Sequence, residues 1–138
     1  MSTSVQQLRD SMRDKLDQLD EKVKDVKIDI EQTNLEREAD IHVKVEQARA
    51  KASAMHDDAV RSRAKIEGDF SAKRAEWQGK VQDWKAERNK KSLDARADDA
   101  EVFASAAFDV AVSAVYEADL AILEAIEARQ QADAVAGT

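Results

Sequence analysis

The sequence predicts an all-α protein: an elongated antiparallel helical bundle or coiled coil of two or three long helices, completed by dimerisation. Three observations favour this fold class. The 138 residues include no proline and only three glycines, so the turn residues that β-sandwiches and barrels need are missing. Charged residues form 37% of the chain and aromatic residues 4%, which leaves little material for a thick core. An apolar stripe at helical spacing also runs through most of the chain.

The first helix is predicted over about residues 3–55, because the apolar side chains of this segment share one narrow helical face. The face is made by Val5, Leu8, Met12, Leu16, Leu19, Val23, Val26, Ile30, Ile41, Ala48, Ala52 and Met55. Within it, an apolar residue recurs every 11 positions from Leu8 to Ala52, a spacing typical of a straight or slightly right-handed helix. The stripe is weak around the polar residues Thr33 and Asn34, and again at His56 to Asp58.

The stripe continues beyond this segment, so we expect the helix to continue or bend into about residues 58–89. The residues in phase with it are Ala59, Ile66, Phe70, Trp77, Val81 and Trp84, with no slip at Gly68. Ser and Asp side chains near His56 compete for backbone hydrogen bonds, so a straight helix and a bend there both stay open. From Phe70 the spacing becomes strictly seven residues, as in a coiled coil.

A return helix is predicted over about residues 92–134, and with it one helical domain over residues 1–138. Asn89, two lysines and Ser92 before Asp94 are typical of a helix end followed by a new N-cap. Apolar side chains cover more than half of the circumference of the return helix. The strip suited to solvent contains Asp98, Asp109, Ser113, Glu117, Glu124 and Glu127. A helix with such a wide apolar arc needs several neighbours.

The aromatic residues are expected to gather when the chain reverses near residues 90–92. An antiparallel return from that turn places Trp84 near residue 98, Trp77 near 105 and Phe70 near 112. The predicted aromatic core consists of Phe70, Trp77, Trp84, Phe103, Phe108 and Tyr116. Residues 61–91 have a net charge of +5 and residues 92–138 one of −8, so opposite charges favour this pairing.

The amino-terminal part of the stripe predicts an interface. If residues 3–90 form one straight helix, residues 1 to about 47 lie beyond the hairpin and need cover, either from a fold-back near His56 or from a second chain. We expect a homodimer or higher homo-oligomer, because the broad apolar face of the return helix demands more neighbours than one chain supplies. The predicted interface residues are Leu8, Met12, Leu19, Val23, Val26, Ile30 and Ile41.

The sequence contains few of the residue patterns that catalysis or cofactor binding needs. The chain has no cysteine, three glycines are too few for a Gly-rich phosphate loop, and neither histidine follows a glutamate by three residues as di-metal carboxylate bundles require. His42 has Glu38 and Glu46 one turn away on either side, so a metal site stays open beside the simpler interpretation as exposed ion pairs. We therefore predict no enzyme, no catalytic residue and no cofactor.

Nucleic acid and membrane-spanning roles are disfavoured. The ten basic residues of segment 61–91 spread around their helix, and the net charge of the chain is −7. The apolar stretch 102–126 contains four acidic residues, so no transmembrane segment is expected. The start of the chain lacks the apolar run of a signal peptide, which predicts a cytoplasmic location.

The function predicted from these features is a non-enzymatic structural or protein-interaction module that acts as a homo-oligomer. A further protein partner stays open. The alternative is an amphipathic coat that binds a lipid or hydrophobic granule surface peripherally, since 11-residue periods also occur in helices that lie on such surfaces. The stripe of residues 5–55 is narrow and aliphatic, which favours the first function over the second.

Overall fold

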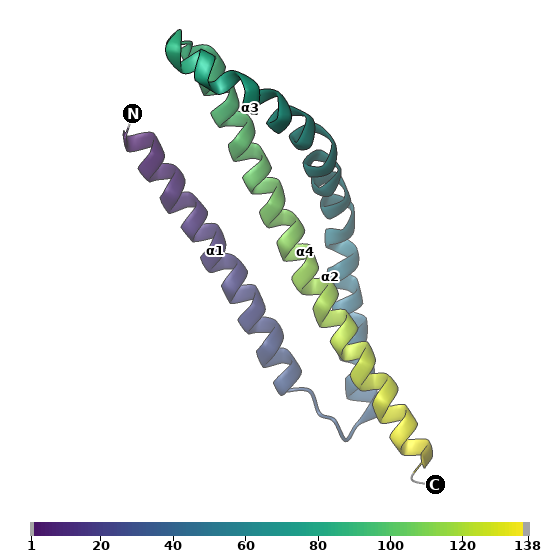
Figure 1. Cartoon of the computed structure of the whole chain (residues 1–138). Helices are drawn as coiled ribbons and strands as arrows, with labels where there is room; N and C mark the ends of the chain where they lie inside the picture. Colours follow the sequence, from purple (N-terminus) through teal and green to yellow (C-terminus); the bar gives the residue numbers. More distant parts are fainter. Residues whose placement is uncertain (1, 137–138) are drawn as a thin grey trace. The chain divides into compact units, whose positions relative to one another are not determined.

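The computed structural model describes the backbone of residues 2–136 and the side chains of residues 5–135. Its elements are all helical, and residues 2–136 contain no strand, so the all-α prediction is confirmed. In chain order they are α1 (Ser2–Glu31), α2 (Glu38–Lys65), the π-helical turn η1 (Ile66–Phe70), α3 (Ser71–Ala86) and α4 (Lys90–Ala136), as labelled in Figure 1. The chain divides into two compact units: unit 1 (residues 1–56 and 111–138) and unit 2 (residues 57–110).

A break at residues 32–37 divides the helix that was predicted over residues 3–55. The Thr33 hydroxyl donates to the carbonyl of Asp29 at 2.9 Å, and the Asn34 side-chain oxygen accepts the N–H of Glu36 at 3.0 Å. Both contacts give the backbone a local alternative to the helical hydrogen-bond pattern. The weak point of the stripe is thus a complete helix end, and α2 begins afresh at Glu38.

Unit 1 has an aliphatic core between antiparallel segments of α2 and α4, which lie side by side in Figure 1. Ile41, Val45 and Ala48 of α2 meet Leu123 of α4, and all four are buried. Three polar contacts flank this core and fix the antiparallel register: His42 Nδ1 with Glu127 Oε2 at 3.0 Å, Arg49 Nη2 with Glu124 Oε1 at 3.4 Å, and Gln131 Nε2 with Glu38 Oε1 at 3.3 Å.

Unit 2 contains the end of α2, then η1, α3 and the start of α4. The backbone stays helical through His56, so no break occurs there; the irregularity falls instead at η1, which includes Gly68. A π-helical turn closes i→i+5 hydrogen bonds and so holds an extra residue compared with an α-helical turn. The apolar stripe therefore changes phase at η1 rather than continuing unchanged as predicted.

The reversal between α3 and α4 occurs earlier than predicted. Arg88 adopts a left-handed φ of 53°, which ends α3, and the Asn89 side chain accepts the N–H of Ser92 at 3.2 Å. Asn89 rather than Ser92 therefore caps α4, which starts at Lys90.

This earlier turn changes the register of unit 2. The ring centroids of Phe70 and Phe103 are 4.1 Å apart, and Lys73 Nζ contacts Asp99 Oδ2 at 3.1 Å. Phe70 was predicted near residue 112, nine positions further along. Each residue by which the reversal moves shifts the facing partner by two, so a turn at residues 87–89 instead of 90–92 accounts for most of the correction.

Candidate interaction surfaces

The predicted interface residues of α1 stay accessible within unit 1. None of the described side chains of α1, residues 5–31, is buried. We call its apolar face the α1 stripe; it consists of Val5, Leu8, Met12, Leu16, Leu19, Val23 and Val26. Val5 is 69% exposed, Leu16 54% and Val23 48%, while the other four are partly exposed. At 1.5 Å per residue the helix that presents this stripe is about 45 Å long.

The last two predicted interface residues, Ile30 and Ile41, lie at the core of unit 1. Ile41 is fully buried in the core of unit 1, and Ile30 packs against that core at the end of α1. Ile41 is therefore part of the interior of its own chain and offers no surface to a second one. The reason is the break at residues 32–37, which separates the stripe of α1 from that of α2.

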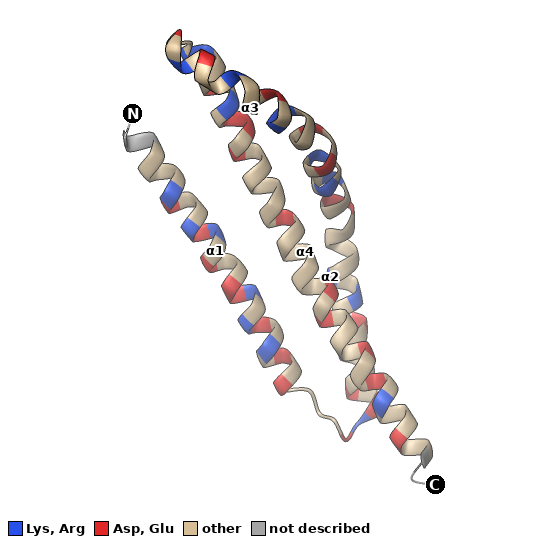
Figure 2. Ribbon diagram, viewed as in Figure 1, with Lys and Arg blue, Asp and Glu red and all other residues tan. Residues whose placement is uncertain are grey.

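The charges of α1 are distributed unevenly along its length. The colours of the ribbon in Figure 2 mark basic and acidic positions along the whole helix. Residues 2–16 include three basic and two acidic side chains, whereas residues 17–31 include three basic and six acidic ones. The first half has a net charge of +1 and the second of −3, so two copies of α1 attract each other more in an antiparallel than in a parallel pairing.

A second apolar surface of unit 1 is a groove of about 880 Å³ beside the loop between α1 and α2. Its lining residues are Leu35, Glu36, Ile122, Ala125, Ile126, Arg129, Gln130, Asp133 and Ala134. Leu35 is 59% exposed and Ile122 44%, and the Gln130 side-chain oxygen is buried without a hydrogen-bond partner. The groove is a mainly apolar hollow with polar groups at its edges.

Sequence reasoning did not single out Asp119, which is a buried acid of unit 1 and only 3% exposed. Burial raises the pKa of its carboxyl, and Asp29 raises it further, while Lys51 and Lys44 oppose the rise. A signal was present in the sequence, because Asp119 lies outside the strip of α4 that was predicted to face solvent.

The predicted solvent strip of α4 is wrong at Ser113. This residue is 2% exposed, and its hydroxyl oxygen has no hydrogen-bond partner.

His42 contacts acids of two helices. Its Nδ1 lies 3.0 Å from Glu127 Oε2, and its Nε2 lies 3.9 Å from Glu46 Oε1. Glu38 is instead the acceptor of Gln131. Within the described residues, no group of three or more His, Asp or Glu side chains is arranged to hold a metal ion. The contacts of His42 lie at the edge of the unit 1 core, and the one with Glu127 joins α2 to α4.

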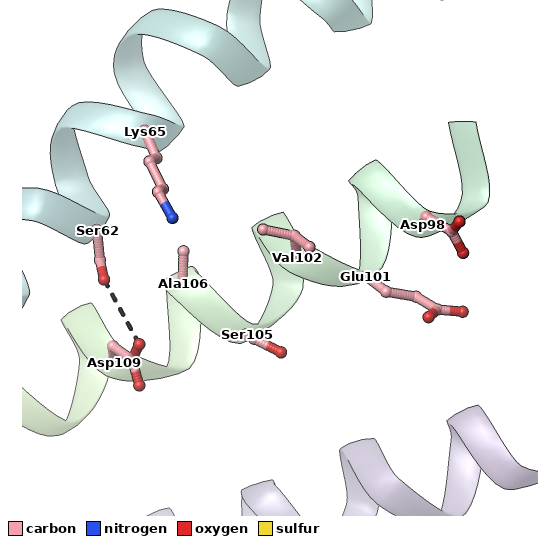
Figure 3. Close-up of a pocket in the computed structure, with 8 residues that line it drawn as sticks. All are labelled: Ser62, Lys65, Asp98, Glu101, Val102, Ser105, Ala106 and Asp109. Carbon is pink, nitrogen blue, oxygen red and sulfur yellow. Dashed lines mark hydrogen bonds between the residues drawn. The ribbon is translucent and has the colours of Figure 1, made fainter. Parts of the chain in front are cut away.

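Unit 2 has a polar hollow of about 470 Å³, shown in Figure 3. Ser62, the most buried of its polar residues, has its hydroxyl 3.5 Å from Asp109 Oδ2. Figure 3 also shows Lys65 extending from α2 towards α4, whereas Asp98 and Glu101 point away from Ser62.

The predicted aromatic core is only partly assembled. Phe70 contacts Phe103 and lies edge-on to Trp77, with ring centroids 6.4 Å apart, and the Arg74 guanidinium lies 4.6 Å from the centroid of its ring. Phe103 is the buried member of the set, and the other five are partly exposed. Tyr116 belongs to unit 1, apart from the five aromatic residues of unit 2.

No known family model matches the chain, and no similar curated protein or solved structure was found. In the part of the chain that the structure describes, none of the helices is long and apolar enough to cross a bilayer. The interpretation of the α1 stripe and of the groups around Asp119 therefore depends on their own chemistry.

Proposed function

We propose that the protein is a non-enzymatic interaction module that forms a homodimer through the α1 stripe. One observation supports this most strongly: α1 is a 30-residue helix with an apolar stripe, and none of its described side chains is buried. An exposed apolar face of this length is typical of a surface that is covered by a partner. The 11-residue repeat of this face favours a nearly straight helix, which can lie alongside a second helix over its whole length.

A second copy of the chain is the partner that the charges favour. Antiparallel pairing places the +1 half of one α1 against the −3 half of the other. Paired charges at the edges of such a contact select the orientation, whereas the apolar residues between them provide the affinity. Full overlap of the two helices places residue 8 of one copy close to residues 25 and 26 of the other.

Molar mass measured by light scattering tests this proposal. The wild-type chain is expected to have twice the mass of one chain, and Leu19→Asp the mass of one chain, because an acid in the centre of the stripe places a charge in the apolar contact. Ile28→Asp is the matched control: the same helix receives the same acid, but Ile28 is 48% exposed and points nearly opposite to the stripe. This variant is expected to remain dimeric.

A wild-type chain that stays monomeric at about 100 μM contradicts the proposal, because the dissociation constant of the dimer would then lie well above that concentration. If that monomer also gains helix content on neutral lipid vesicles, and Leu19→Asp abolishes the gain, the amphipathic coat replaces the homodimer as the function of the stripe.

A further inference from the structure

Asp119 is a buried acid that the proposed pairing of the α1 stripe does not explain. Asp119 of α4 is 3% exposed, and its Oδ1 has no hydrogen-bond partner. A buried ionised carboxylate is costly unless it is paired and hydrogen-bonded, whereas the protonated acid is not charged. The protonation state of Asp119 therefore affects the stability of whatever covers it.

The charged groups that act electrostatically on Asp119 come from two other helices. Leu120, next to Asp119, and Ile30, next to Asp29, pack against the same core. Asp29 belongs to α1, and Lys44 and Lys51 belong to α2. Lys44 Nζ already donates to Asp29 Oδ1 at 2.6 Å, with both side chains about 30% exposed. An ionised Asp119 would compete with Asp29 for Lys44 and would repel Asp29 at the same time.

This cluster lies where α1 is attached to unit 1. We call residues 29–33 the α1 root: Ile30 packs against the core, Thr33 is buried, and Asp29 pairs with Lys44. Among residues 5–135, this pair is the ion pair that joins α1 to another helix. The α1 root extends into the loop of residues 32–37, so one of its ends belongs to a short non-helical connection.

We propose that Asp119 acts as a proton-operated latch for the α1 root: the protonated acid allows the root to dock, and loss of the proton weakens docking. When the root leaves, Asp119 gains solvent, and its ionised form no longer faces Asp29. The proton is thus bound more strongly in the docked state than in the undocked state.

The sign of the pH dependence follows from this linkage. Burial and Asp29 raise the pKa of Asp119 in the docked state above its usual value. Docking is therefore strongest below the usual pKa and weakens as pH rises through the raised one. For a single proton the change is at most about tenfold per pH unit.

Amide hydrogen exchange of the α1 root, followed by mass spectrometry and corrected for the intrinsic rate, tests the latch. In the wild-type chain, protection of residues 29–37 is expected to fall as pH rises through the raised pKa of Asp119. In Asp119→Asn, protection is expected to be higher than wild type at pH 8 and independent of pH. Asp133→Asn, an exposed acid on the same helix, is the matched control and is expected to follow the wild type.

The same pH profile in Asp119→Asn as in the wild type overturns the latch. Asp29→Asn provides a second test, because Lys44 is then free to pair with Asp119; the fall in protection is expected to move to lower pH, and an unchanged midpoint counts against the proposal. If Asp119→Asn does not fold, the carboxyl resonance of Asp119 in the wild-type chain is titrated by NMR instead. The latch is then overturned if the amide chemical shifts of Ile30 and Thr33 do not change at the pH where the Asp119 carboxyl titrates.

One consequence rests on the proposed function: a released root gives α1 more freedom to pair with a second copy, so dimerisation would respond to pH. The two proposals remain distinguishable when the exchange experiment is repeated in the Leu19→Asp background. An effect of Asp119→Asn that persists there supports the latch within one chain, even where light scattering contradicts the dimer.

Discussion

Leu19 and Ile41 belong to the same 11-residue repeat, two periods apart, yet Leu19 is partly exposed and Ile41 is fully buried. Ile41 is fully buried against α4, whereas none of the described side chains of α1 is buried. The difference arises from chain connection rather than from hydrophobicity. The turn at residues 87–89 brings α4 back along α2, whereas the break at residues 32–37 interrupts the stripe, and α1 meets that core at Ile30. An apolar stripe thus identifies the face that needs cover, and the connections decide whether its own chain provides that cover.

The largest expected effect tests the difference in burial between Ile41 and Leu19. Ile41→Asp places a charge in the unit 1 core and is expected to cost more than about 4 kcal/mol of unfolding free energy, or to prevent folding of unit 1. Leu19→Asp is the matched change on α1 and is expected to cost less than about 0.5 kcal/mol in the monomer. Urea unfolding followed by circular dichroism, at a concentration where both chains are monomeric, checks the pair. Equal losses would show that α1 is packed as tightly as α2.

A second prediction extends the comparison to the aromatic residues of α4. Phe103 is buried against Phe70, whereas Phe108 is partly exposed on the same helix. Phe103→Ala is expected to destabilise unit 2 by about 3 kcal/mol, and Phe108→Ala by about 1 kcal/mol. Tryptophan emission is expected to move to longer wavelength only for Phe103→Ala, because Trp77 packs against Phe70. The reverse order of the two losses would contradict the register described for unit 2.

The smallest expected effect concerns the break itself. Thr33→Val keeps the shape of the side chain but removes the hydroxyl that donates to the Asp29 carbonyl. The expected loss is about 1 kcal/mol, the typical net contribution of such a hydrogen bond. Thermal unfolding of the variant measures it, with Ser53→Ala on the exposed face of α2 as a control. A Thr33→Val variant as stable as the wild type would show that the hydroxyl does not hold the α1 root.

The fold class could be predicted from sequence because proline is absent and the stripe has helical spacing, and both depend only on local geometry. The register of unit 2 could not. It depends on Arg88, whose left-handed backbone ends α3 four residues before the predicted N-cap at Ser92. Nothing in the side chain of an arginine signals that conformation, which is more typical of glycine or asparagine.

The helix break and the buried acid were only partly visible in the sequence. Thr33 and Asn34 marked a weak point, but a polar pair in a stripe does not show whether its side chains will bond to the backbone or to solvent. Asp119 lay outside the polar strip of α4, yet the charges that act on its carboxyl belong to Asp29, Lys44 and Lys51 on two other helices. Such a cluster appears only once the helices are placed together.

Cysteine cross-linking tests the central claim, antiparallel pairing of two α1 helices, most directly, because the natural chain contains no cysteine. Chains with Leu8→Cys and chains with Val26→Cys are mixed and oxidised, and the disulfide-linked products are separated by mass. The proposed pairing predicts a disulfide between the two variants in the mixture and little between copies of either variant alone. Efficient linkage of Leu8→Cys to itself would show parallel pairing, and no linkage in any combination would show that α1 does not pair with a second copy.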